Sequence, residues 1–241
     1  MPATTALPEL PPEKRRYVRA MFSAVAARYD LLNHLLSLNV DRAWRRRAIA
    51  RLGWEARPDG RYLDACAGTL DLALWLASRP GFRGRVVATD FALPMLRVGV
   101  AKRGREAVHS AAADTLELPL ADEAFDGALV GFGVRNLSDL SAGLGELVRV
   151  LKPGARLVVL DFATPRSTLV RALYLAYFRR VLPVVGRLVS GHPTAYSYLP
   201  ESVMRFAEPE ALARSLSEAG LHDVGCQRLT GGIAALTWGT R

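Results

Sequence analysis

The chain has 241 residues, half of them hydrophobic, with a formal net charge of +9 and an isoelectric point near 10.1. This length fits one α/β domain with appendages, and two cysteines are too few for a disulfide framework, so a reducing cytoplasm is expected. No apolar run approaches the roughly 18 residues of a membrane-spanning helix, and the N-terminus lacks the apolar core of a signal peptide. The positive charge indicates an anionic partner, nucleic acid or an acidic membrane surface, unless arginine serves only for solubility.

The first 60 residues are predicted to form a flexible tail followed by a helical cap. Residues 1–11 are the tail, and the cap covers 12–56. Apolar residues at three- and four-residue steps predict the first helix: Val18, Met21, Phe22, Val25 and Tyr29. A second apolar piece follows at 30–40. Asp41 is expected to be the N-cap of a further helix that carries Trp44, Ala48, Ile49 and Leu52.

After Gly60 the sequence alternates between strand and helix patterns. Strands are predicted at 61–65, 85–89, 107–112, 126–132 and 155–162, and helices at 70–78, 93–104 and 139–151. Such repetition predicts a doubly wound parallel sheet, within a single domain over 12–241. An insertion at 163–207 contains a segment, 167–189, that is apolar almost all round. The remaining elements are a helix at 208–219 and strands near 222–229 and 232–239.

Residues 61–77, RYLDACAGTLDLALWLA, have the pattern of a ligand-binding turn. An apolar strand ends in Asp64, a loop of small residues surrounds Gly68, and an amphipathic helix follows. In open α/β sheets the loop amides and the helix N-terminus of such a turn face a nucleotide-like ligand. Cys66 and Leu70 stand where a G-x-G-x-G loop would have its outer glycines. This departure argues against a dinucleotide and favours S-adenosylmethionine (SAM), which carries no phosphate.

Acidic residues end three consecutive predicted strands: Asp64, Asp90 and Asp114. Ligands of such sheets bind at the carboxyl ends of the strands. An acid after the second strand can accept hydrogen bonds from both ribose hydroxyls. An acid after the third can accept from the adenine amine, while the backbone amide of Thr115 reaches a ring nitrogen. A single acid of this kind is more often a solvated loop residue or a helix cap, but three in register predict a nucleoside site. Asp64, Asp71 and the Thr69 hydroxyl are expected to orient the loop or to meet the aminoacyl end.

Residues 131–136, GFGVRN, are the candidate chemical site. Gly131 and Gly133 flank Phe132, and Arg135 and Asn136 follow at the end of an apolar strand. An Arg–Asn pair at this position is expected to point into the mouth of the active site. The alternative is a surface arginine followed by an asparagine that caps the next helix.

Four strings fall in the order and spacing of one family: YDLLNHLLSLNVDRAW (29–44), FDGALVGFGVRNLSD (125–139), RVLKPGARLVVLDF (149–162) and AYSYLPES (195–202). On these residues the chain resembles the ubiquinone/menaquinone-biosynthesis C-methyltransferases, which use SAM to methylate a ring carbon of a polyprenylated quinol. The resemblance implies a SAM-dependent methyltransferase (Rossmann-like) fold. Its seven-stranded sheet is mostly parallel with the last strand antiparallel, and helices cover both faces.

The resemblance also implies roles for individual residues. The SAM contacts it implies are Thr69, Asp90, Asp114, Thr115 and Gly131, beside Asp64 and Gly68 of the loop. The quinol pocket it implies is lined by Tyr29, Arg135 and Asn136. Arginine stays protonated, so Arg135 is expected to favour the ionised quinol while Asn136 fixes the ring. The candidate proton acceptors are water, Tyr29, His34 and His192, and no metal is required.

Several features of the sequence admit more than one interpretation. The family usually has glycine at the position of Leu70, whose side chain must either crowd SAM or turn into the core. The expected reaction converts demethylmenaquinol to menaquinol, and methylation of both quinone types is the alternative. A non-catalytic SAM-binding protein is a further alternative; an RNA methyltransferase is disfavoured because no basic–aromatic interleaving is present, and no nucleic-acid partner is expected. Segment 167–189 suits a polyprenyl groove and peripheral contact with the inner face of the membrane, or a buried core helix with snorkelling arginines. A homodimer is also left open.

Overall fold

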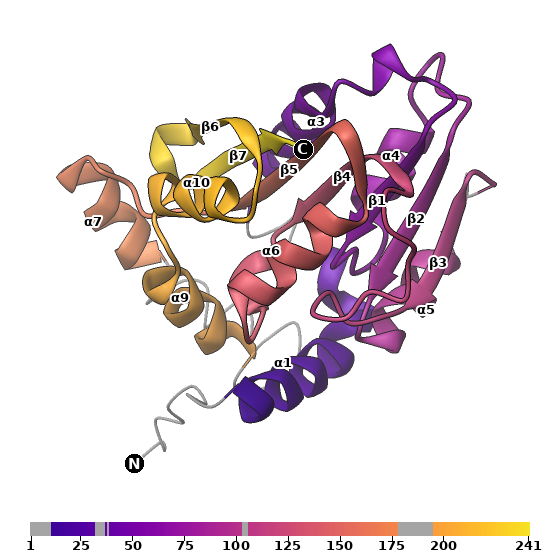
Figure 1. Ribbon diagram of the computed structural model, residues 1–241. Coiled ribbons are helices and arrows are strands. Elements are labelled where there is room, and N and C mark those ends of the chain that lie inside the picture. Colours follow the sequence, from indigo (N-terminus) through magenta and orange to yellow (C-terminus); the bar gives the residue numbers. More distant parts are fainter. Residues whose placement is uncertain (1–10, 32–36, 38, 103–105, 178–194) are drawn as a thin grey trace.

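A central seven-stranded sheet organises the protein (Figure 1). The computed structural model describes residues 11–31, 37, 39–102, 106–177 and 195–241. The strand order is β3-β2-β1-β4-β5-β7-β6. The strands are β1 Arg61–Ala65, β2 Arg85–Asp90, β3 Val108–Ala112, β4 Phe125–Gly131, β5 Leu151–Phe162, β6 His222–Leu229 and β7 Ala234–Thr240. Only β7 runs antiparallel to its neighbours, β5 and β6. The predicted fold is confirmed, including the antiparallel last strand.

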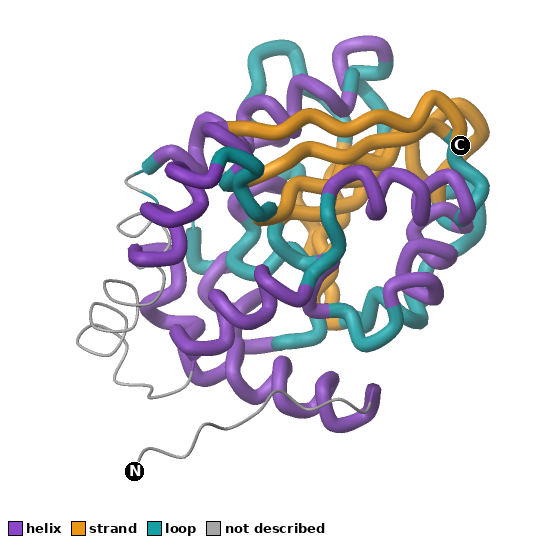
Figure 2. The backbone as a smooth tube through the Cα atoms, turned by 90° about the vertical axis from the view of Figure 1, so that its left-hand side faces the viewer, coloured by secondary structure: helices purple, strands orange, loops and turns teal. Residues whose placement is uncertain are grey.

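Helices cover both faces of this sheet, which forms one continuous layer in Figure 2. The helices are α1 Pro11–Val25, α3 Val40–Leu52, α4 Asp71–Ala77, α5 Leu93–Val100, α6 Leu140–Arg149, α7 Thr168–Ala176, α9 Ala195–Arg205 and α10 Pro209–Glu218. Short 3₁₀ turns are η1 Ala26–Arg28, η2 Trp54–Ala56, η3 Val134–Asn136 and η5 Thr230–Gly232. Helices α3, α4 and α5 pack on one face, and α6 and α10 on the other. Because both faces are covered, the middle of β5 is buried without alternation.

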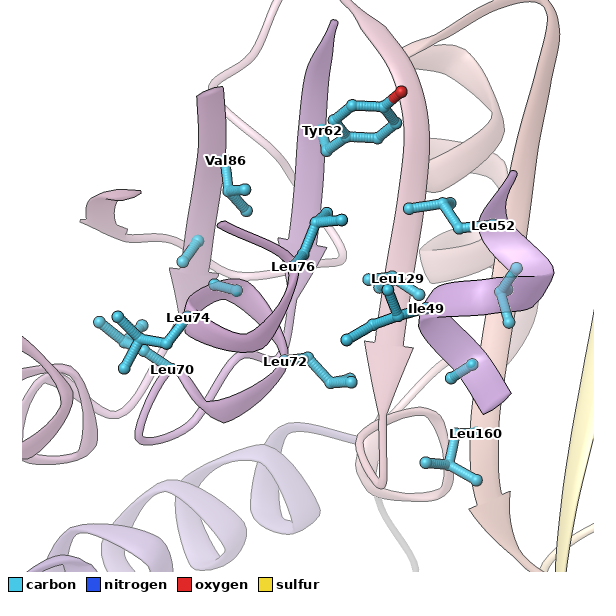
Figure 3. Packing of buried hydrophobic residues seen from close by; sticks show 14 of the residues in the cluster. Ile49, Leu52, Tyr62, Leu70, Leu72, Leu74, Leu76, Val86, Leu129 and Leu160 are labelled. Carbon is cyan, nitrogen blue, oxygen red and sulfur yellow. The ribbon is translucent and has the colours of Figure 1, made fainter. Parts of the chain in front are cut away.

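The core on the α3–α4 face contains Leu70, whose side-chain direction the sequence alone does not decide. Ile49 and Leu52 of α3 meet Leu129 of β4, and Leu70 belongs to the same cluster (Figure 3). Leu70 is 1% exposed. A leucine at this position is therefore part of the packing between helix and sheet.

Three predicted boundaries were wrong. Asp41 does not cap its helix: the N-cap is Asn39, with a left-handed φ of 61°, and Asp41 lies buried in the first turn. There it accepts a hydrogen bond from the Ser37 hydroxyl (2.7 Å) and pairs with Arg45 (3.3 Å). Strand β5 begins at Leu151, because the chain pairs with β4 already ahead of the Lys-Pro-Gly turn. Helix α5 ends at Val100, short of 104.

The tail, the domain division and the long apolar segment are only partly described. Residues 1–10 and 178–194 lie outside the described residues, so the tail and the second half of segment 167–189, from 178 on, stay predictions. Helix α7 is the described beginning of that segment. None of the described helices has the length and hydropathy needed to cross a bilayer.

Helix α1 lies across the carboxyl edge of the sheet, at the bottom of Figure 1. Its buried side chains, Val18, Met21 and Val25, pack with Tyr198 of α9. The fold thus brings the N-terminal cap and the insertion after β5 together over the strand ends.

Candidate functional site

A cavity lies where the strand order reverses, between the ends of β1 and β4, under α1. Such a switch point is the usual ligand site of open α/β sheets. Seven of the ten predicted site residues line it: Tyr29, Gly68, Asp90, Asp114, Thr115, Gly131 and Asn136. Arg15, Phe22, Cys66, Phe91 and Met95 line it as well. Its volume is about 60 Å³, well below the roughly 300–1,000 Å³ of ordinary ligand pockets.

The loop after β1 bends through three left-handed residues: Cys66 (φ 53°), Gly68 (φ 54°) and Leu70 (φ 68°). The side chain of Leu70 turns into the core and does not line the cavity. It fills the space that a side chain at Gly99 of α5 would need: a Cβ there would lie 2.3 Å from Leu70 Cγ. The leucine that stands here in place of the usual loop glycine therefore does not crowd the cavity.

Asp90 fixes the loop and keeps capacity for a ligand. Its Oδ2 accepts from the Gly68 amide and its Oδ1 from the Ala92 amide, both at 2.8 Å. Burial raises the pKa of Asp90, and these two backbone hydrogen bonds oppose the rise. A carboxylate has about four lone-pair sites, so two remain for ligand hydroxyls.

Asp114 and Thr115, which follow β3, line the same cavity. Asp114 Oδ1 accepts from the Leu116 amide (2.9 Å), and its Oδ2 pairs with Arg15 Nε of α1 (2.5 Å). The Thr115 hydroxyl is 3.3 Å from Cys66 Sγ. The carboxylate predicted to bind adenine is thus already paired with the helix that covers the cavity.

Replacing Arg15 by alanine should tighten SAM binding about two- to five-fold. The Arg15 side chain is 56% exposed, and an exposed ion pair contributes about 0.2–1 kcal/mol; a cofactor that binds at Asp114, as the sequence predicts, has to overcome this amount. Titration calorimetry with SAM measures the change. Arg19→Ala, an exposed arginine further along α1, is the charge-matched control. Weaker binding in Arg15→Ala alone would mean that Arg15 itself holds the cofactor.

Asp64 and Thr69 do not line the cavity. Asp64 is buried below the loop, where its Oδ2 accepts from the Ala73 amide of α4 (2.9 Å) and its Oδ1 has no hydrogen-bond partner among the described residues. The Thr69 hydroxyl donates to Asp30 of the cap, which also pairs with Lys102 (2.8 Å). Of the roles considered for these two residues, orienting the loop is the one that these hydrogen bonds favour.

Asp64 gives a test by pH. Burial raises the pKa of Asp64 from 3.8 to about 7, against the opposing effects of the Ala73 amide and Arg45. The folded state then binds the proton more tightly than the unfolded state, so this contribution to stability is complete below about pH 4 and is lost as pH rises to about 7. Between pH 5 and 8 the unfolding free energy of Asp64→Asn should fall less than that of the wild type. At about 1.4 kcal/mol per pKa unit, the largest difference in unfolding free energy that this shift can produce is roughly 4 kcal/mol. Equal slopes in urea titrations would contradict the shift.

Arg135 and Asn136 lie on η3, directly after β4, but only Asn136 lines the cavity. Arg135 is buried and its Nη1 donates to Asp161 Oδ1 at 2.7 Å. Burial acts to lower the pKa of Arg135, but the Asp161 carboxylate raises it, so the guanidinium stays charged. Its Nε is buried without a hydrogen-bond partner among the described residues. The sequence predicted an arginine pointing into the mouth, whereas the structure places it in a buried ion pair beside the cavity.

Other contacts at the site were not foreseen. Tyr198 of α9 donates to Asn136 Oδ1 (2.9 Å), and Lys14 of α1 donates to the Leu137 carbonyl (2.6 Å). Tyr198 lies in the string AYSYLPES, which was the available signal. His34 and His192, two of the candidate proton acceptors, lie outside the described residues.

The sheet order, with its antiparallel β7, is that of the SAM-dependent methyltransferase fold. A solved SAM-dependent methyltransferase from Thermotoga maritima, described as a possible histamine N-methyltransferase, has this fold. It matches with a TM-score of 0.65 and 19% identity over 92% of this chain and 98% of that one. At this identity the likeness concerns the fold alone.

The chain belongs to the ubiE/COQ5 methyltransferase family, whose model matches residues 12–241. The demethylmenaquinone methyltransferase of Thermus thermophilus is 50% identical over 225 residues, which cover 92% of this chain and all of that protein. The ubiquinone/menaquinone biosynthesis C-methyltransferase UbiE of Geobacter sulfurreducens is 41% identical, over 95% of this chain and 90% of that protein.

Proposed function

We propose that this protein transfers a methyl group from SAM to a ring carbon of demethylmenaquinol, giving menaquinol. The observation that carries the proposal is a single cavity with two chemically different walls. Asp90 and Asp114 lie on one wall, and Asn136, beside the buried Arg135–Asp161 pair, lies on the other. The 50% identical relative from Thermus thermophilus supports this substrate.

The residues of the first wall fit SAM. Asp90 has spare lone pairs for ribose hydroxyls, Asp114 and Thr115 suit the adenine, and glycines at 68 and 131 let a ligand approach the backbone. When bound, SAM supplies an electrophilic methyl group on a positively charged sulfur. Asp64 and Thr69 hold the loop from behind.

The residues of the second wall act on the quinol. The positive charge of Arg135, which is buried beside the cavity, lowers the pKa of the quinol hydroxyl and so favours the nucleophilic anion. Asp161 balances that charge when no quinol is bound. Asn136 and Tyr29 orient the ring, and α1 excludes water. The ring proton leaves to water or to Tyr29. This reaction requires no metal, because the methyl donor already carries the charge that activates it.

Transfer of a radiolabelled methyl group from SAM to each acceptor tests the proposal. Labelled menaquinol is the expected product from demethylmenaquinol. A demethylated benzoquinol acceptor tests the second candidate, a methyltransferase for both quinones, which the UbiE relative at 41% identity favours. SAM binding by calorimetry without transfer to either quinol would instead identify a non-catalytic SAM-binding protein. Labelling of RNA would overturn the substrate class.

We also propose that the protein contacts the cytoplasmic face of the membrane through α7. Leu169 and Leu173 lie one turn apart on this helix and are 69% and 65% exposed, with the exposed Arg171 between them. The two exposed leucines share one face of α7, which suits a lipid surface where a polyprenylated substrate resides, while Arg171 projects from another face of the helix. No nucleic acid takes part in this proposal, and a homodimer stays a prediction.

Liposome co-sedimentation measures this contact. Leu169→Ser combined with Leu173→Ser should lower binding to anionic vesicles at least five-fold, since about 0.8 kcal/mol is lost for each buried methylene. Leu93→Ser, which changes an exposed leucine of α5 (41%), is the matched control. Equal binding of the double variant and the wild type would contradict the membrane contact.

A further inference from the structure

The hydroxyl of Tyr198 lies against the carboxamide of Asn136, although the two residues are 62 positions apart in the chain. It donates to Asn136 Oδ1 at 2.9 Å. The Tyr198 side chain is held firmly, since the residue is 3% exposed and packs in one cluster with the buried side chains of α1. Its ring lies 5.8 Å from that of Tyr17. The hydroxyl therefore reaches the site from a ring that α1 and α9 fix from outside.

The carboxamide of Asn136 is held at both ends. Its Nδ2 donates to the Phe132 carbonyl (3.2 Å) while its Oδ1 accepts from Tyr198. A flipped amide would place its oxygen against the Phe132 carbonyl oxygen, two acceptors facing each other. Since an asparagine amide has two N–H groups and two lone pairs, one of each remains for a ligand. Because Asn136 lines the cavity, that remaining N–H is a donor of fixed orientation.

Tyr198 acts here as a donor and not as a base. Burial raises the pKa of Tyr198 to about 12, against the opposing effect of Arg135, so the hydroxyl keeps its proton at neutral pH. Lys14 of α1 holds the same turn from another side, through the carbonyls of Arg135 (3.3 Å) and Leu137 (2.6 Å). The turn with the Arg–Asn pair is thus positioned by the cap and by the insertion together.

We propose that Tyr198 is a positioning residue for the quinol: it fixes the Asn136 carboxamide so that its free N–H binds a quinol oxygen. The inference rests on the proposed function, because only there is Asn136 assigned to the quinol wall. It deepens that function by extending the substrate site to α9 of the insertion after β5.

Tyr198→Phe is the direct test, because it removes the hydroxyl and keeps the ring against Tyr17. We expect kcat/KM for demethylmenaquinol to fall about ten-fold, the equivalent of one hydrogen bond of about 1.4 kcal/mol. The dissociation constant for SAM should stay within about two-fold of the wild type, since no cofactor residue is touched. Tyr62→Phe is the matched control: this buried hydroxyl donates to the carbonyls of Trp54 and Arg57, away from the cavity. It should lower stability without changing kcat/KM.

A double-mutant cycle with Asn136→Ala separates positioning from general destabilisation. In the Asn136→Ala background, Tyr198→Phe should lower kcat/KM less than about two-fold further. A full ten-fold fall in that background, an equal fall in Tyr62→Phe, or wild-type kinetics in Tyr198→Phe would each overturn the proposal. A menaquinol titration followed by tryptophan fluorescence measures the affinity for the quinol, and so compares Tyr198→Phe with the wild type without turnover. Absence of methyl transfer by the wild type thus overturns the proposed function, while unchanged menaquinol affinity in Tyr198→Phe overturns the positioning role.

Discussion

Replacing Arg135 by alanine is expected to lower turnover at least about a hundred-fold and to destabilise the fold by about 3–5 kcal/mol. The turnover loss is the usual scale for removing one preorganised electrostatic stabiliser of a developing anion. The stability loss follows because Asp161 is 3% exposed and would be left as a buried, unpaired carboxylate. SAM affinity should stay near normal, since Arg135 does not line the cavity that contains Asp90 and Asp114. Methyl transfer, urea unfolding and calorimetry measure the three quantities.

The double variant Arg135→Met with Asp161→Leu separates the two effects. Removing both partners leaves no unpaired charge, so stability should return to within about 1 kcal/mol of the wild type while turnover stays low. Arg83→Ala breaks an exposed ion pair with Asp59 at the other edge of the sheet and is expected to change stability by less than about 1 kcal/mol. Recovery of turnover in the double variant, or its survival in Arg135→Ala, would remove Arg135 from the quinol chemistry.

The sheet could be predicted from the sequence because its signals are local. Short apolar runs alternate with helical periodicity, and the acids Asp64, Asp90 and Asp114 follow three of those runs. Boundaries were less predictable, since they depend on how individual side chains pair. Asp41 has the chemistry of an N-cap, but Arg45, one turn later, draws its carboxylate into a buried pair, and Asn39 takes the cap position.

The side-chain contacts around the cavity could not be predicted, because they join residues from distant parts of the chain. Arg15 meets Asp114, and Tyr198 meets Asn136, through helices whose placement over the strand ends periodicity does not encode. Arg135 is the clearest example of a side chain whose direction depends on a residue distant in the sequence. The sequence placed a cation at the end of a strand, but its direction depends on Asp161 of the neighbouring strand, and the pairing of β4 with β5 brings the two together.

Replacing Leu70 by glycine, the residue that a regular SAM loop has there, is expected to destabilise this protein by about 2–3 kcal/mol. Two effects oppose each other. Glycine relieves the left-handed strain at φ 68°, worth about 1–2 kcal/mol. Loss of a fully buried leucine is larger, about 2.7–5 kcal/mol for a leucine-to-alanine change in a packed core. The cavity left beside α5 therefore outweighs the relief, and urea unfolding should show it together with weaker SAM binding by a loosened loop.

Gly99→Ala should be as damaging, because its new Cβ would lie 2.3 Å from Leu70 Cγ and 2.8 Å from the Thr69 carbonyl carbon. The two changes are complementary: in the Leu70→Gly background the first clash is gone, so the double variant should lose less stability than the two single losses added together. The Thr69 contact remains, which keeps the rescue partial. Gly145→Ala, on an open helix position, is the control and should be neutral or stabilising. Tighter SAM binding by Leu70→Gly with unchanged stability would contradict this account, since the leucine would then be obstructing the cavity and not filling the core.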